Sequence, residues 1–227
     1  MDLSKRRDVV FLIMAGLFVT NAIVAELIGG KIISFFGVFT QSVGIILWPF
    51  VFLMTDLINE HYGRKGVKRL TYITVGLIAY TFLLLSAAIN FPAIQGSPVS
   101  DAAFTQVFGQ SQWIIVGSII AFFISQLTDV YVFWIFRNLT NGKMIWLRAT
   151  GSTLISQIID TFLVQYIAFV LPGNWTTSEW LQRAAAGYAF KMLVAVALIP
   201  LIYLGHKLIA RFLKDHTERI TDDSKLI

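Results

Sequence analysis

Long apolar stretches recur along the chain and are separated by short polar segments. Six of them are about twenty residues long, at roughly 8–29, 42–60, 70–90, 112–136, 149–171 and 186–209. At about 1.5 Å per residue, a helix of this length crosses a hydrocarbon core of about 30 Å. The runs are continuous rather than alternating, which favours helices over a β-barrel. The pattern predicts an all-α integral membrane protein, with residues 1–227 forming a single transmembrane domain, a bundle of six helices.

Two longer polar segments connect these runs. In residues 91–111, Ser100 precedes a short amphipathic stretch, which predicts an interfacial helix. In residues 171–185, Thr176 and Glu179 have the spacing of a capping box at the start of a helix. Two interpretations of these segments stay open: lipid anchoring, or a lid over an outward-facing cavity.

The composition supports a lipid environment. Of the 227 residues, 56% are hydrophobic and 14% are charged, and the mean hydropathy is +0.72. A soluble domain usually has about a quarter of its residues charged. There is too little polar surface here to cover a globule in water, so lipid must cover it.

Basic residues lie at one set of predicted helix ends. The N-terminal tail, the connections after the second and fourth runs and the C-terminal tail hold 15 of the 18 Lys and Arg residues. The positive-inside rule therefore places the N- and C-termini inside, in the cytoplasm. The net charge of +5 is then a topology signal, and no nucleic-acid partner is expected.

Several chemistries lack the residues they need. The chain has no cysteine, which excludes disulfides and zinc–thiolate sites. Its three histidines, His61, His206 and His216, are assigned to the cytoplasmic loops and tail, which disfavours haem binding or a Ser–His dyad within the bilayer. We expect no metal, no cofactor and no enzyme activity.

One polar pattern occurs twice inside the predicted spans. Ser-Gln-x-x-Asp appears with Gln126 and Asp129 in the fourth span, and with Ser156, Gln157 and Asp160 in the fifth. The two spans run antiparallel, so Gln126 should lie level with Asp160, and Asp129 level with Gln157. Within each helix the Gln and Asp side chains share a face.

Two interpretations of this repeat stay open. The facing polar side chains could form a pocket near the midplane, as in many transporters, or they could bond to each other and hold the two helices together. A carboxylate accepts two parallel N–H bonds and a primary amide pairs an acceptor with a donor. A pocket of this kind would match the edge of a guanine-like ring, and its two aspartates would also suit a cationic group.

A second polar group ends the second span. Thr55 and Asp56 are followed by Glu60, which has helical i, i+4 spacing to Arg64. Asp56 is interpreted either as an interfacial anchor or as part of a cytoplasmic gate.

A third polar group comes from the first and last spans. Glu26 and Lys191 have similar predicted depths, so they could form an ion pair. Alternatively, Lys191 contacts substrate together with Tyr188, which is three residues earlier on the same face. Asn21 in the first span is a further candidate contact.

Four segments closely resemble the queuosine precursor transporter family, part of a wider group of vitamin uptake transporters. They are "FLMTDLINEHYGRKGVKR" (52–69), "SQLTDVYVFWIFRNLTNGKMIWLR" (125–148), "GSTLISQIIDT" (151–161) and "YAFK" (188–191). The resemblance covers most of the chain, from about residue 20 to 205, with the segments in the same order.

The resemblance implies import of queuosine precursors for transfer-RNA modification, across a bacterial cytoplasmic (inner) membrane. The substrates would be the deazapurines 7-cyano-7-deazaguanine, 7-aminomethyl-7-deazaguanine or queuine. The family motif maps onto Thr55, Asp56, Gln126, Asp129, Ser156, Gln157, Asp160 and Lys191.

We assign these residues to two groups. The expected substrate-binding set is Asn21, Gln126, Asp129, Ser156, Gln157, Asp160, Tyr188 and Lys191. The expected gating or coupling set is Glu26, Thr55 and Asp56.

Other aspects of function stay open at this point. The aspartates could bind substrate or carry a coupling proton. An alternative function is that of a substrate-binding membrane subunit of an ATP-energised vitamin importer. It would need ATPase partners, since the chain has no phosphate-binding Gly-Lys loop. The coupling ion and a homodimer are not determined by the sequence.

Overall fold

The computed structural model describes residues 3–35, 39–109, 112–141 and 143–223. Seven α-helices account for most of this chain: α1 (Leu3–Leu27), α2 (Trp48–Ile89), α3 (Asp101–Phe108), α4 (Gln112–Leu139), α5 (Ile145–Gln165), α6 (Thr177–Ala197) and α7 (Ile199–Asp223). The remaining elements are an antiparallel hairpin of β1 (Ile32–Phe35) and β2 (Phe39–Ser42), a 3-10 turn (Val43–Ile46) and a π-helical turn (Tyr166–Val170).

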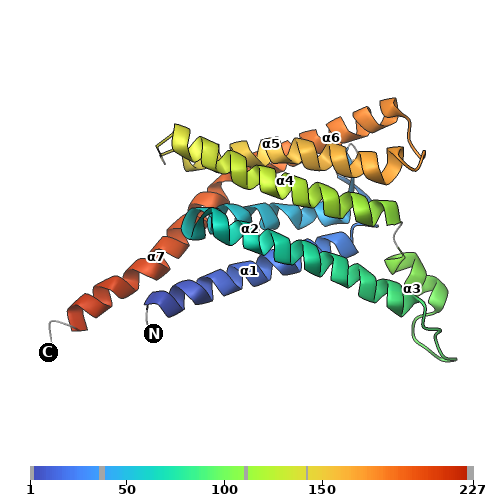
Figure 1. The fold of residues 1–227 in the computed structure, drawn as a ribbon, viewed down its shortest axis with the longest axis horizontal. Helices are drawn as coiled ribbons and strands as arrows, with labels where there is room; N and C mark the ends of the chain where they lie inside the picture. The colour runs from blue at the N-terminus through green and yellow to red at the C-terminus, as the bar shows by residue number, and fades with distance from the viewer. Residues whose placement is uncertain (1–2, 36–38, 110–111, 142, 224–227) are drawn as a thin grey trace.

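Helix α2 is two helices that meet at Gly63. This glycine has φ 74° and ψ 175°, which interrupts the helix. The backbone region is essentially restricted to glycine. Figure 1 shows the chain doubling back within α2, so that the halves 48–62 and 64–89 run in opposite directions from the reversal. The predicted second and third spans are therefore joined by one residue rather than by a basic loop.

The number of candidate spans depends on how the broken helices are counted. Four described stretches are long and apolar enough to cross a membrane, and the bent pair α6–α7 makes a fifth. One of the four, Val43–Ile89, contains the reversal at Gly63, so counting its halves separately gives six. The chain is thus an all-helical membrane bundle. Figure 1 places the start of α1 and the far end of α7 at the same end.

The sixth span differs from the single helix predicted over 186–209. It begins earlier, at Thr177, and it breaks after Ala197, where the axis turns by 43°. Pro200 lies just beyond the break. Proline cannot donate the backbone hydrogen bond that would continue a helix.

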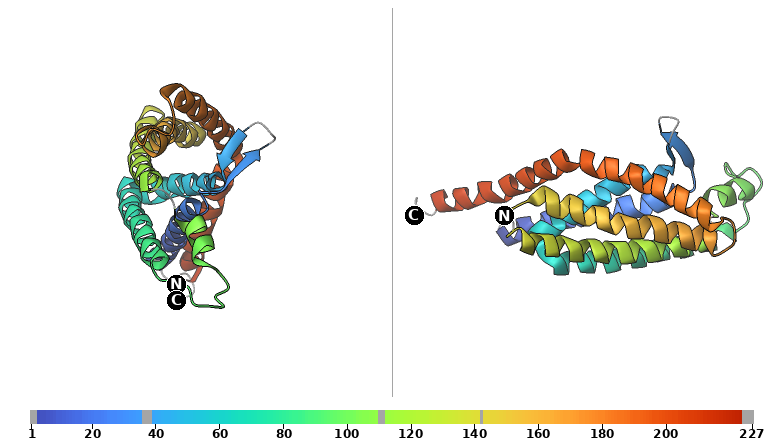
Figure 2. Two further views of the ribbon diagram at one scale, coloured as in Figure 1. Left: turned by 90° about the vertical axis from the view of Figure 1, so that its right-hand side faces the viewer. Right: turned by 90° about the horizontal axis from the view of Figure 1, so that it is seen from above.

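Both predicted helix starts in the connecting segments are confirmed. Ser100 caps α3, its hydroxyl accepting a hydrogen bond from the Ala103 N–H. Thr176 and Glu179 form the expected capping box of α6. The β1–β2 hairpin was not predicted. Figure 2 shows it beside α6, at the opposite end of the bundle from the N-terminus.

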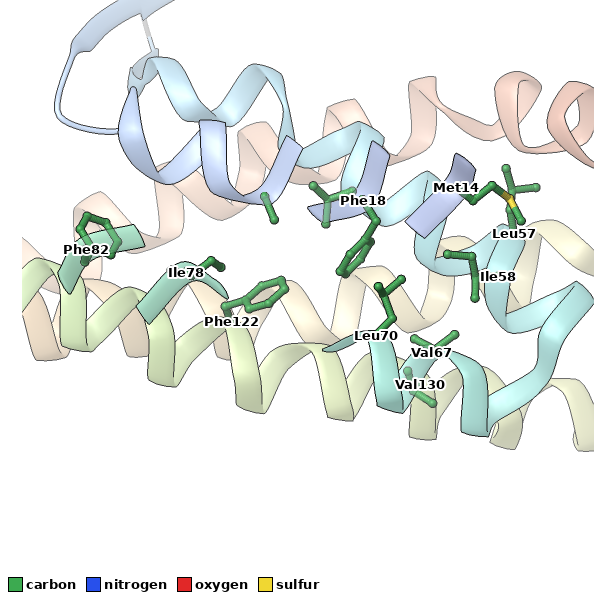
Figure 3. Packing of buried hydrophobic residues seen from close by; sticks show 12 residues of the cluster. Met14, Phe18, Leu57, Ile58, Val67, Leu70, Ile78, Phe82, Phe122 and Val130 are labelled. Carbon is green, nitrogen blue, oxygen red and sulfur yellow. The ribbon is translucent and has the colours of Figure 1, made fainter. Parts of the chain in front are cut away.

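The apolar core joins α1, both halves of α2, and α4. Phe18, Ile58, Val67, Phe122 and Val130 are fully or almost fully buried in this cluster, and Figure 3 shows them converging between the three elements. Many large apolar side chains are instead exposed on the outside of the bundle, as expected of a surface that faces acyl chains. The core fixes α2 against α4, and α5 is then positioned by α4.

Candidate functional site

The two Ser-Gln-x-x-Asp segments contact each other across α4 and α5. Ser125 Oγ donates to Asp160 Oδ1 at 3.4 Å, and Ser156 Oγ donates to Asp129 Oδ1 at 3.2 Å. Each serine thus serves the aspartate of the other copy, as expected for antiparallel helices carrying the same motif. These contacts hold α4 and α5 together, which was one of the two open interpretations.

The glutamines of the two segments have different environments. Gln126 Nε2 donates to Thr55 Oγ1 at 2.7 Å and so connects α4 to α2. Gln157 is 2% exposed, and its Oε1 has no hydrogen-bond partner. The first glutamine is part of the packing between helices, whereas the second presents an unpaired acceptor.

Lys191 of α6 is paired with the second aspartate. Its Nζ lies 2.7 Å from Asp160 Oδ2. Tyr188 of the same helix donates to the Leu154 carbonyl oxygen at 3.1 Å. Both contacts fasten α6 to α5. Glu26, which the sequence offered as one of two possible partners of Lys191, is buried and interacts electrostatically with both Asp160 and Lys191.

Asn21 bonds within its own helix. Its Nδ2 donates to the Leu17 carbonyl oxygen at 2.7 Å. This contact ties the amide group to its own helix, and Asn21 is not among the residues that line the pocket described below.

The predicted helical pair of Glu60 with Arg64 is wrong. Gly63 interrupts the helix between them, and the Arg64 guanidinium lies over the Tyr131 ring. Glu60 Oε2 is instead 2.8 Å from Arg148 NH2. Arg148, which the hydropathy pattern assigned to a cytoplasmic loop, is only 2% exposed.

A pocket lies among α2, α5, α6 and the start of α7. Its polar lining comes from Asp56 of α2, from three residues on one face of α5, and from Lys191 of α6. The remaining lining is apolar, and the full set is Ile45, Trp48, Pro49, Phe52, Leu53, Asp56, Thr150, Thr153, Gln157, Lys191, Val194, Ala195, Leu198 and Ile202. The α5 residues facing the pocket follow helical spacing, while Ser156 and Asp160 face elsewhere, toward α4 or α6.

The pocket is a narrow slot. The space between its side chains is about 500 Å³ when the open mouth is included. Only about 30 Å³ can hold the centre of a water molecule. The smaller volume describes the enclosed part of the slot, because the larger volume includes solvent outside its walls. A ring-shaped ligand would require the walls to separate.

Three buried acceptor atoms at the pocket lack hydrogen-bond partners: Asp56 Oδ1, Thr150 Oγ1 and Gln157 Oε1. Buried polar groups are nearly always paired, so each exception calls for an explanation. A ligand that donates hydrogen bonds would satisfy the three oxygens around the slot. Thr150 and Thr153 were missed by the sequence analysis. Their i, i+3, i+7 spacing with Gln157 was the available signal.

An aromatic pair forms one wall of the slot. Trp48 and Phe52 both line it, with ring centroids 6.0 Å apart and planes inclined by 22°. They are one helical turn apart on α2, so their rings point the same way. The wall offers a flat apolar surface next to the unpaired oxygens.

The predicted site residues therefore divide into two layers. Among the expected substrate-binding residues, Gln157 and Lys191 line the slot, and Asp56 of the gating set joins them. Behind them, Thr55, Gln126, Asp129, Ser156, Asp160 and Tyr188 make the contacts between helices described above. In the part of the chain that the structure describes, no group of three acidic or histidine side chains could hold a metal ion.

Comparison with known proteins decides the family. A family model described as "Putative vitamin uptake transporter" matches residues 42–205, which is most of the chain. The chain belongs to the vitamin uptake transporter family. As such it is a multi-pass membrane transporter and not an enzyme.

Curated relatives of this vitamin uptake transporter carry a more specific name. A "Probable queuosine precursor transporter" of Bacillus subtilis (strain 168) is 31% identical over 79% of this chain and 77% of its own. The "Queuosine precursor transporter" of Escherichia coli (strain K12) is 27% identical, with 79% of each chain covered. A "Probable queuosine precursor transporter" of Haemophilus influenzae is 25% identical over 73% of this chain and 68% of its own. No solved structure matches the chain significantly.

Proposed function

We propose that this transporter imports queuosine precursors into the cytoplasm, where they serve transfer-RNA modification. The candidates are 7-cyano-7-deazaguanine, 7-aminomethyl-7-deazaguanine and queuine. Two independent observations support the proposal. The relatives named as queuosine precursor transporters cover most of the chain, and the slot presents three unpaired buried oxygens beside an aromatic wall.

The chemistry of the slot suits a deazaguanine. The guanine-like edge of such a ring has adjacent N–H donors, and an ionised carboxylate such as Asp56 accepts two parallel bonds. Gln157 Oε1 and Thr150 Oγ1 are further acceptors. A ring stacked on Trp48 and Phe52 gains about 1–3 kcal/mol per aromatic contact by analogy with base stacking.

The break in the sixth span suggests how the slot opens. Leu198, the residue at the break between α6 and α7, lines the slot together with Ala195. Transporters often build their sites from interrupted helices and expose them by moving one bundle against another. Movement of α7 about this break would widen the slot enough for a flat ring.

The proposed location is the bacterial cytoplasmic membrane, with both termini inside. Figure 1 shows the start of α1, the reversal within α2 and the end of α4 at one end of the bundle. Arg7, Arg64 and Arg137 belong to these three stretches. This agrees with the positive-inside rule. The β1–β2 hairpin and α3 then lie outside the cell.

Uptake measurements test the proposal. Cells lacking their own route for queuosine precursors would be given labelled 7-cyano-7-deazaguanine. Competition would use unlabelled queuine, the aminomethyl compound and guanine. We expect the deazaguanines to compete, and no uptake of any of them would contradict the proposal. The purified chain should also transport in liposomes without an ATPase partner, whereas an energised importer subunit would not.

Asp56→Asn should weaken substrate binding. Loss of a hydrogen bond to a charged group costs about 1.5–3 kcal/mol, so the KM for uptake should rise at least about tenfold. The matched control is Asp101→Asn, which removes an exposed carboxylate on α3. A normal KM in the Asp56 variant would remove this residue from the site.

A further inference from the structure

Asp129 is a buried carboxylate that the proposed substrate does not reach. It is 2% exposed and is not part of the lining of the slot. Ser156 donates to its Oδ1, and the hydroxyls of Ser152 and Thr153 also interact with the carboxyl group. Its Oδ2 has no hydrogen-bond partner. The group is held firmly on one side and lacks a donor on the other.

Asp129 is electrostatically linked to the slot through Asp56. The two carboxylates repel each other across the α2–α4 interface, and Asp56 Oδ1 is also unpaired. Two ionised carboxylates buried within the membrane raise the free energy by several kcal/mol unless a cation pairs with them or one of them is protonated. Arg148 attracts Asp56 but is also paired with Glu60. The carboxylates of Asp56, Asp129 and Glu60 together therefore carry more negative charge than this one guanidinium neutralises.

The other charged groups near α4 also have partners, and one of them, Arg148, acts on Asp56 as well. On α5, Arg148 lies over the Phe133 ring and is bound by Glu60 of α2. Asp160 touches Ser125 and is bound by Lys191 of α6.

Two further titratable groups face α4 from its neighbours. Glu26 of α1 interacts with Ser118, towards the outer end of α4. Tyr166 of the π-helical turn packs edge-on against Trp180. Asp129 thus differs from Asp56 in lying behind the slot, where hydroxyl groups hold one of its oxygens and the other oxygen is unfilled.

We propose that Asp129 binds the coupling proton of this transporter. The inference rests on the proposed function, because coupling requires a transported substrate. With the proton on Asp129, Asp56 can remain ionised and accept the N–H donors of the substrate. Without it, the repulsion between the two carboxylates disfavours the loaded state. The proton and the substrate therefore enter together from outside, and the proton leaves when the cytoplasmic opening wets Asp129.

Proteoliposomes containing the full chain separate coupling from transport. The probe is labelled 7-cyano-7-deazaguanine, which carries no charge of its own. Counterflow at equal pH measures exchange, and accumulation with the outside about one pH unit more acidic measures coupling, with the membrane potential held at zero. For one proton per substrate we expect about tenfold accumulation.

The variant Asp129→Asn should keep counterflow and lose the accumulation. Retained counterflow proves that the variant is folded. The matched control Asp8→Asn, which changes an exposed carboxylate at the start of α1, should keep both activities. If Asp129→Asn does not fold, Ser156→Ala provides the test. The charged carboxylate loses a donor there, so the pH profile of coupled uptake should move to higher pH.

Four outcomes would overturn the inference. Counterflow without any response to the pH gradient would remove proton coupling but leave the proposed function intact. Accumulation driven by a sodium gradient and not by pH would assign a different ion. Normal gradient-driven accumulation by Asp129→Asn would exclude this residue. Absence of counterflow with all three deazaguanines would contradict the proposed function and this inference with it.

Discussion

Identical residues in the two Ser-Gln-x-x-Asp segments acquire different tasks from their neighbours. The serines are equivalent, since each donates to the aspartate of the other segment. The glutamines are not, because Gln126 is bonded to Thr55 while Gln157 Oε1 stays unpaired at the slot. The aspartates also differ: Asp160 has a lysine partner and Asp129 has only hydroxyl donors at one oxygen. A repeat in sequence is therefore not a symmetric site.

The aromatic wall gives a test at this scale. Trp48→Leu should raise the KM for uptake about five- to a hundredfold, because a stacking contact of about 1–3 kcal/mol is lost. Trp113→Leu is the matched control, since Trp113 is half-exposed on the outside of α4. Equal KM values in labelled-substrate uptake for the two variants would show that no ring stacks on Trp48.

Sequence reasoning located some of these residues and missed others. The contact between the two repeated segments followed from antiparallel helices and a rise of about 1.5 Å per residue. Thr150 and Thr153 were missed because threonine is common in apolar helices and carries no charge to mark it. Arg148 was misplaced because a hydropathy average treats every arginine near a span end as a loop residue. In the structure its ion pair with Glu60 allows the guanidinium to be buried between the helices.

At the scale of elements, the observed spans differ from the predicted ones mainly where the backbone breaks. The runs 42–60 and 70–90 looked independent, yet they are joined through the single non-helical residue Gly63. The sixth run was predicted as one helix and is bent by 43° before Pro200. The β1–β2 hairpin could not be predicted because each strand has only four residues. A strand this short gives too few positions to reveal an alternation of apolar and polar residues.

Substitution of Gly63 should destabilise the fold. An alanine would have to adopt φ 74° and ψ 175°, which costs about 1–3 kcal/mol for a residue with a Cβ. No atom crowds the added methyl group, so the effect comes from the backbone alone. Thermal unfolding in detergent should therefore show a lower Tm for Gly63→Ala.

Gly76→Ala, in the second half of the same helix and also free of crowding, is the control. It should leave the Tm unchanged or raise it, because alanine favours a regular helix by about 1 kcal/mol. A Gly63 variant as stable as the Gly76 variant would mean that the reversal tolerates a side chain.

At the scale of the whole molecule, the proposed orientation rests on the charge distribution and on the positions of the helix ends in the bundle. An even number of spans brings both termini to one side, and α1 begins where the basic residues gather. The all-helical membrane bundle could be predicted because it depends on length and hydropathy. The location of the slot could not, because it depends on which faces of α2, α5 and α6 meet.

The absence of native cysteine makes this orientation directly measurable. Ile94→Cys introduces a thiol in the strongly exposed segment before α3, where Ile94 is 81% exposed. A membrane-impermeant maleimide should label it in intact cells. Asp8→Cys, near the start of α1, should be labelled only after the cells are opened. The reverse pattern would invert the proposed topology.

The one-residue reversal at Gly63 also bears on how the protein is made. With no linker between its halves, α2 offers the insertion machinery a helical hairpin rather than two spans in succession. Asp56 and Asn59 lie just before the tip, where a lone helix would expose them to lipid at a cost of several kcal/mol. Once residues 64–89 have been synthesised, the two halves of α2 can enter the membrane together. A nascent chain that stops near residue 63 should therefore fail to insert residues 48–62 stably.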